Sequence, residues 1–139
     1  MQALTRRSFI CGSAAVAALT ALPAVAATGV KTLKNGTTVI DLAANKTLSS
    51  VGGLIELSIK QYGKVAVVRT SKSVNGFSVI NLACPHAGVI VSKSNDGWIC
   101  NPPGHGSVFA LNGALKVGQA TSALRSIKFT ATSKALTIS

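Results

Sequence analysis

Two short segments of the chain combine the residue types that bind soft metal ions. Cys84-Pro85-His86 and Cys100-Asn101-Pro102-Pro103-Gly104-His105 contain both histidines of the 139-residue sequence and two of its three cysteines. Thiolate and imidazole ligands suit zinc or an iron–sulfur centre, whereas calcium and magnesium prefer oxygen ligands. A lone buried cysteine or histidine usually serves packing, but two such pairs predict one metal site built from two loops.

The elements that must position these loops are short strands. Runs of strand length, rich in β-branched and apolar residues, alternate with turn signals such as Asn35-Gly36 and Asn112-Gly113. The expected strands are residues 37–42, 54–59, 65–70, 77–82, 89–92, 97–99, 107–111, 114–117, 126–132 and 135–138. Few stretches have helical periodicity. The sequence therefore predicts one all-β domain, an antiparallel sandwich or small barrel.

The first residues of the chain have the segment order of an export signal. Arg6 and Arg7 precede Phe9 and an alanine-rich run that extends to residue 26, as in secretory leaders. The arginine pair resembles the twin-arginine export signal, although Ile10 and Cys11 replace its usual leucine and lysine. This resemblance implies export of the folded protein to the periplasm or another extracytoplasmic space.

Small residues predict where the leader is removed. Ala24 and Ala26 occupy the two positions that a signal peptidase recognises, so we expect cleavage after Ala26, with Ala27 as second choice. The organisation is then a leader over residues 1–26 and a mature domain over residues 27–139. The alternative is a leader kept as a membrane anchor, but its many alanines favour insertion less than leucine or isoleucine would.

Composition limits the functions of the chain. Its length allows one domain. The net charge of +11 favours anionic partners. Asp41, Glu56 and Asp96 are the only acidic residues, which leaves little general acid–base chemistry, and no phosphate-binding loop or haem-attachment motif occurs. Nucleic-acid binding is disfavoured because aromatic residues are few and the lysines are scattered. We expect no catalytic site in the chain itself.

The two loops resemble those of the Rieske [2Fe–2S] family. Each loop of that family supplies one cysteine and one histidine, and the second histidine is followed by Gly-Ser, here His105-Gly106-Ser107. The resemblance covers most of residues 53–139. It implies a small Rieske-like β-fold with one [2Fe–2S] cluster per chain, in which Cys84 and Cys100 bind one iron and His86 and His105 bind the other.

The resemblance also assigns residues beside the cluster. Gly106 and Ser107 follow the second histidine, and the Ser107 hydroxyl is expected to donate a hydrogen bond to a bridging sulfide. Phe109 occupies the position where high-potential members have a tyrosine. Because that donor is missing, we expect a reduction potential below theirs, within the Rieske span of roughly −150 to +300 mV.

The sequence departs from the family pattern in the second loop and around it. Four residues separate Cys100 from His105, where two are usual. Val89 replaces one of the two additional cysteines that join the loops in many members, so their disulfide is absent. Residues 118–121 replace a proline-rich loop without its proline.

The resemblance implies an exported electron-transfer protein or the electron-transfer subunit of an oxidoreductase. Similar chains include the small subunit of arsenite-oxidase-type enzymes and the iron–sulfur subunit of quinol–cytochrome c reductases, and the sequence does not separate these from a free carrier. The expected partner is a c-type cytochrome or a larger oxidoreductase subunit, with an acidic surface that docks over His86 and His105. Lys72, Lys93 and Lys116 are the lysines nearest to the loops in sequence. A structural Cys₂His₂ zinc site is the alternative of a different class.

Overall fold

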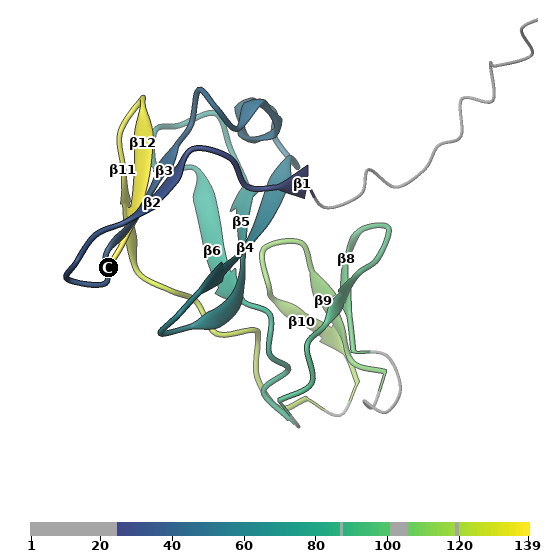
Figure 1. Cartoon of the computed structure of the whole chain (residues 1–139). Helices are drawn as coiled ribbons and strands as arrows, with labels where there is room; N and C mark the ends of the chain where they lie inside the picture. Colours follow the sequence, from purple (N-terminus) through teal and green to yellow (C-terminus); the bar gives the residue numbers. More distant parts are fainter. Residues whose placement is uncertain (1–24, 87, 101–105, 119) are drawn as a thin grey trace, which may run out of the picture.

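The chain folds into three four-stranded sheets, which a computed structural model describes for residues 25–86, 88–100, 106–118 and 120–139 (Figure 1). The strands are β1 (Val25–Ala26), β2 (Val30–Thr32), β3 (Thr38–Asp41), β4 (Leu54–Ile59), β5 (Gly63–Arg69), β6 (Phe77–Asn81), β7 (Ser92–Lys93), β8 (Gly97–Ile99), β9 (Val108–Ala110), β10 (Leu115–Val117), β11 (Phe129–Ala131) and β12 (Ala135–Ile138). A 3₁₀ helix, η1 (Lys46–Ser49), precedes β4. The predicted all-β class is confirmed. Over these ranges, no helix has the length and apolar character needed to cross a membrane.

The central sheet has the order β1-β4-β5-β6 and contains a strand buried on both faces. In β5, Val65, Ala66, Val67 and Val68 are all buried. Successive side chains of a strand point to opposite faces, so a continuous buried run requires packing on both sides of the sheet. Val65 and Val67 belong to one hydrophobic core, and Ala66 and Val68 belong to the other.

The other two sheets supply these two cores from opposite sides of the central sheet (Figure 1). The sheet β11-β12-β3-β2 contributes Ile40, Leu136 and Ile138 to the core around Val67. The sheet β10-β9-β8-β7 contributes Trp98 and Phe109 to the core around Val68. The second of these cores also contains both candidate cysteine ligands, and we call it the site core.

The strand pattern of the sequence agrees best with the structure where strands are apolar. Residues 54–59, 97–99 and 135–138 match β4, β8 and β12. The sequence does not predict β2, because Val-Lys-Thr is a short edge strand with two exposed residues. The expected strand 89–92 is shorter in the structure: Ile90 forms only an isolated bridge with Ala83, which closes a loop before β7.

Substitutions at two adjacent residues should test whether the two cores are distinct. Val67→Ala and Val68→Ala each remove two buried methyl groups, so both should lower the free energy of unfolding by roughly 2 kcal/mol. Trp98 is the only tryptophan and lies in the site core. Val68→Ala should therefore shift the tryptophan emission of the folded protein, and Val67→Ala should leave it unchanged. Urea unfolding gives the first quantity and native-state fluorescence the second. Equal spectral shifts would contradict the division into two cores.

Candidate metal centre

The loop that carries Cys84 and His86 connects β6 to β7 and is closed by backbone hydrogen bonds. The Cys84 N–H donates to the Val89 carbonyl at 2.8 Å, and the Gly88 N–H donates to the Cys84 carbonyl at 2.8 Å. Gly88 has a φ of 71°, a conformation that glycine adopts without strain. Cys84 is buried, with 2% of its surface exposed, whereas His86 is exposed. The loop thus turns its thiol inward and presents its histidine at the surface.

The loop after Cys100 connects β8 to β9 and has the same backbone frame. The Cys100 N–H donates to the Ser107 carbonyl at 2.9 Å, and the Gly106 N–H donates to the Cys100 carbonyl at 2.9 Å. Gly106, with a φ of 68°, is the counterpart of Gly88. In both loops, therefore, backbone hydrogen bonds join the cysteine to a glycine of positive φ and to the residue that follows this glycine.

The common frame explains how the second loop accommodates its longer spacing. Gly88 follows Cys84 by four positions and Gly106 follows Cys100 by six, yet both loops close through equivalent hydrogen bonds. The additional residues therefore fall between two ends that the hydrogen bonds hold. Residues 101–105, including the predicted ligand His105, lie outside the described residues.

The two cysteines fit a shared soft-metal site. Neither forms a disulfide, both are at most 2% exposed, and both belong to the site core with Trp98 and Phe109. Two buried thiols from matching loops provide a sulfur donor pair of the kind that zinc and iron–sulfur centres use. In the part of the chain that the structure describes, no three histidine, cysteine, aspartate or glutamate side chains come together to hold a metal. Cys84, Cys100 and the exposed His86 are thus the predicted ligands that the structure describes.

Ser107 connects the second loop to the segment that follows β10. Its side chain is fully buried, and its Oγ accepts a hydrogen bond from the Ala120 N–H at 3.0 Å. Because this bond uses an oxygen lone pair, the hydroxyl hydrogen can still be donated. Gly118 lies against the same residue: a Cβ at Gly118 would be 2.4 Å from the Ser107 Cα. The segment after β10 therefore sets the position of the serine.

Phe109 lies at the centre of the site core. It is fully buried, pairs across the sheet with Trp98, and shares this core with both cysteines. The Trp98 Nε1–H donates to the Leu111 carbonyl at 3.1 Å, which satisfies the one polar group of that side chain. The aromatic pair thus forms an apolar wall of the candidate site.

Arg125 is a basic residue near the site that the sequence analysis missed. It lines a surface depression together with Cys84, Pro85 and Ser122, which come from the chain after β6 and the chain after β10. These two chain segments run close together in Figure 1. The Arg125 carbonyl also accepts a hydrogen bond from the Asn81 N–H at 2.8 Å, which joins the two segments. Arg125 is far from Cys84 in sequence, so only the fold brings the two together.

The three lysines nearest to the loops in sequence lie on or beside three different strands. Lys72 precedes β6 and Cys84 follows it, so the strand separates them. The Lys93 Nζ contacts the carbonyl oxygens of Ser94 and Asn95. Lys116 is exposed on β10.

No protein-family model and no curated protein matches the sequence. Among solved structures, the chain is similar to the cyanobacterial plasma membrane Rieske protein PetC3 from Synechocystis PCC 6803. The TM-score is 0.55 at 22% sequence identity, and the match covers 71% of this chain and 94% of that chain. The chain has a Rieske-like fold. The fold expected from the two loops and their flanking strands is therefore confirmed.

Gly118→Ala should displace Ser107 and weaken the bond from Ala120. The new Cβ would lie 2.6 Å from the Ser107 Oγ, and the φ of 121° is unfavourable for alanine. Gly52→Ala is the matched control, because Gly52 has a φ of 86° and nothing within 4 Å of an added Cβ. The control should lose about 1–2 kcal/mol of stability from backbone strain, and Gly118→Ala should lose more. Faster amide exchange at Ala120 in Gly118→Ala alone would confirm the contact; equal effects in both variants would contradict it.

Proposed function

We propose that this chain is a one-electron transfer protein that binds a [2Fe–2S] cluster. The observation that carries the proposal is the pair of buried cysteines, outside any disulfide, on two loops with one backbone frame. Cys84 and Cys100 would hold one iron, and His86 and His105 the other. When bound, the cluster supplies a centre that gains and loses single electrons, at a potential raised by its histidine ligands.

The residues of the chain would control access to this centre. Cys84 and Cys100 are buried in one core with Trp98 and Phe109, while His86 lies exposed. The exposed histidine edge would therefore be the point of electron entry or exit. The Ser107 hydroxyl hydrogen would stabilise the reduced state, because a donor favours added negative charge. Phe109 offers no hydroxyl, which favours a potential below that of members with a tyrosine there.

A structural zinc site is the other function that this donor set allows. Zinc also binds two thiolates and two imidazoles, with tetrahedral geometry. Known zinc modules usually pair cysteine with cysteine and histidine with histidine at close spacing, whereas here each loop carries one residue of each type. The Rieske-like fold gives further support to the binuclear cluster.

Metal analysis distinguishes the [2Fe–2S] cluster from the zinc site. Purified protein should contain two irons and two acid-labile sulfides per chain, as the [2Fe–2S] cluster requires. Cys84→Ala and Cys100→Ala should abolish both iron and sulfide. Cys11→Ser should retain them, since Cys11 belongs to the predicted leader. Stoichiometric zinc without sulfide in the wild type would exclude the cluster in favour of the zinc site.

We further propose that the protein acts outside the cytoplasm. Residues 1–26, with Arg6 and Arg7, would direct export by the twin-arginine route, and residues 27–139 would form the exported Rieske domain. Arg6 and Arg7 lie outside the described residues. This route transports folded proteins, so a cluster inserted in the cytoplasm would cross intact. The similar structure is that of a plasma membrane Rieske protein, which supports a location at or beyond that membrane.

The partner would be a redox protein with an acidic docking surface, such as a c-type cytochrome or a larger oxidoreductase subunit. The chain carries a net charge of +11, and Arg125 and Pro85 border the same depression beside Cys84. An acidic patch placed there would approach the cluster closely. The proposal includes a free carrier, an arsenite-oxidase-like small subunit and a quinol–cytochrome c reductase subunit.

Arg125, whose carbonyl binds the Asn81 N–H at the end of β6, and Lys72, which precedes β6, provide a test of this docking surface. Oxidation of the reduced protein by hexacyanoferrate(III), an anionic probe, should slow as salt rises, because exposed charges are screened beyond about 8 Å at physiological ionic strength. Arg125→Ala should lower the second-order rate at low salt by roughly twofold or more. Lys72→Ala should leave it nearly unchanged. Stopped-flow rates that are insensitive to salt, or equal in both variants, would contradict a role for Arg125 in docking.

A further inference from the structure

A buried asparagine holds the backbone immediately after the predicted leader. The Asn45 Oδ1 accepts a hydrogen bond from the Thr28 N–H at 2.9 Å, and the Asn45 Nδ2 donates to the Thr28 carbonyl at 2.6 Å. Asn45 is 4% exposed and occupies the N-cap position of η1, yet its side chain makes no capping bond there. The amide instead binds both backbone polar groups of Thr28, as a neighbouring strand would. We call this arrangement the Asn45 clasp.

Neighbouring contacts extend the clasp along the chain. The Thr28 Oγ1 donates to the Ala44 carbonyl at 2.8 Å, and the Asp41 N–H donates to the Gly29 carbonyl at 3.1 Å. Gly29 has a φ of 59°, and a Cβ there would be 2.8 Å from the Ala44 Cβ. From Thr28 onward, the backbone is therefore fixed against residues 41–45.

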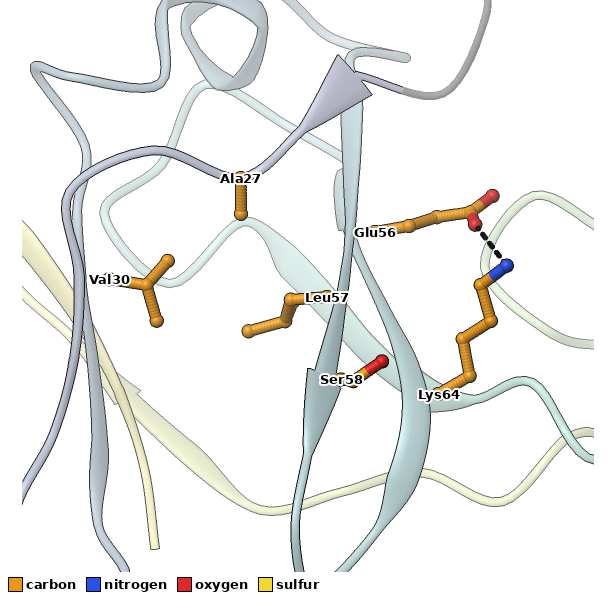
Figure 2. Close-up of a pocket in the computed structure, with 6 residues that line it drawn as sticks. All are labelled: Ala27, Val30, Glu56, Leu57, Ser58 and Lys64. Carbon is orange, nitrogen blue, oxygen red and sulfur yellow. Dashed lines mark ion pairs between the residues drawn. The ribbon is translucent and has the colours of Figure 1, made fainter.

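Of the described residues, 25–27 precede Thr28 and lie at the edge of the central sheet. Among them, Val25 pairs with Ile55 and Ala26 with Glu56, as β1 against β4. Ala27 is half-buried, and its side chain lies on the same side of β4 as Val30 and Leu57 (Figure 2). The Glu56 carboxylate extends to the other side, where it pairs with the Lys64 Nζ at 3.3 Å. Separation of β1 from the sheet edge would thus leave this ion pair and the Asn45 clasp intact.

We propose that the folded domain directs processing to the Ala26–Ala27 bond and protects the Ala27–Thr28 bond. The inference rests on the proposed export leader. A protease of the signal-peptidase class would hydrolyse the peptide bond with water, leaving a carboxylate on Ala26 and an amino group on Ala27. The sequence permits either bond, because small or β-branched residues precede both at the recognised positions.

The two bonds differ in what must open before a protease can reach them. Cleavage at Ala26–Ala27 requires release of β1. Cleavage at Ala27–Thr28 also requires the Thr28 N–H to leave Asn45, which leaves a buried amide without its partners. When opening is fast compared with cleavage, proteolysis follows the population of the open form. Loss of two hydrogen bonds should disfavour the second bond by roughly thirtyfold, equivalent to about 2 kcal/mol.

The experiment compares a purified signal peptidase acting on the folded full chain and on a synthetic peptide of residues 15–36. Mass spectrometry of the products gives the ratio of the two cuts. We expect both bonds to be cut in the peptide, which cannot form the clasp, and only Ala26–Ala27 in the folded chain. A peptide cut at Ala26–Ala27 alone would show that the sequence suffices and would overturn the proposal. A folded chain cut at Ala27–Thr28, or at neither bond, would also overturn it. A peptide cut at neither bond would instead refute the leader on which the proposal rests.

Variants of the clasp provide a second test in the full chain. Asn45→Ala should yield products that begin at both Ala27 and Thr28. Asn45→Asp keeps the acceptor for the Thr28 N–H but loses the donor, so it should yield fewer products that begin at Thr28 than Asn45→Ala does. It replaces Asn45→Ala in the test if that variant does not fold. The matched control is Asn35→Ala, which removes an exposed hydrogen bond from the Thr37 N–H at 3.1 Å. Its products should begin at Ala27 only. Unchanged products in folded Asn45 variants would show that the clasp does not protect the bond.

Discussion

The burial of β5 on both faces is the constraint on which the rest of the structure depends. Four consecutive apolar residues require a layer on each side of the central sheet, and the chain supplies those layers from separate sets of strands. One layer contains the loops with Cys84 and Cys100, and the other contains none of the ligand-type residues in the described part of the chain. The central sheet thus holds the candidate site without contributing a ligand from β5.

Much of the fold could be predicted from the sequence because its strands are apolar and its turns are rich in Asn and Gly. β4, β8 and β12 agree with the expected runs residue for residue. The edge strands β1 and β2 could not be predicted, since their pairing partners, and not their own composition, make them strands. The all-β class follows from local sequence patterns, whereas the edge strands depend on tertiary contacts.

Only part of the candidate site, likewise, could be predicted from the sequence. The types and spacing of Cys84, His86 and Cys100 were enough to predict two ligand loops, because thiol and imidazole pairs are rare in such a short chain. The equivalence of the two loop frames depends on the backbone at Gly88 and Gly106, for which the sequence offers only the glycines. Contacts between distant segments, such as Ala120 with Ser107 and the position of Arg125 beside Cys84, have no signal in the sequence.

The independence of the two cores has a consequence for the order in which the protein assembles. The core around Val67 draws on residues before Leu82 and after Arg125, so it is complete without either ligand loop. A newly made chain can thus form the core that joins two of its sheets before any metal arrives. The base of the first loop would then already be held by β6, whereas the second loop depends on the β8–β9 ladder of the other core. Insertion of a metal centre would act on a scaffold that has largely formed, and the last step of folding would coincide with the closing of the loops around it.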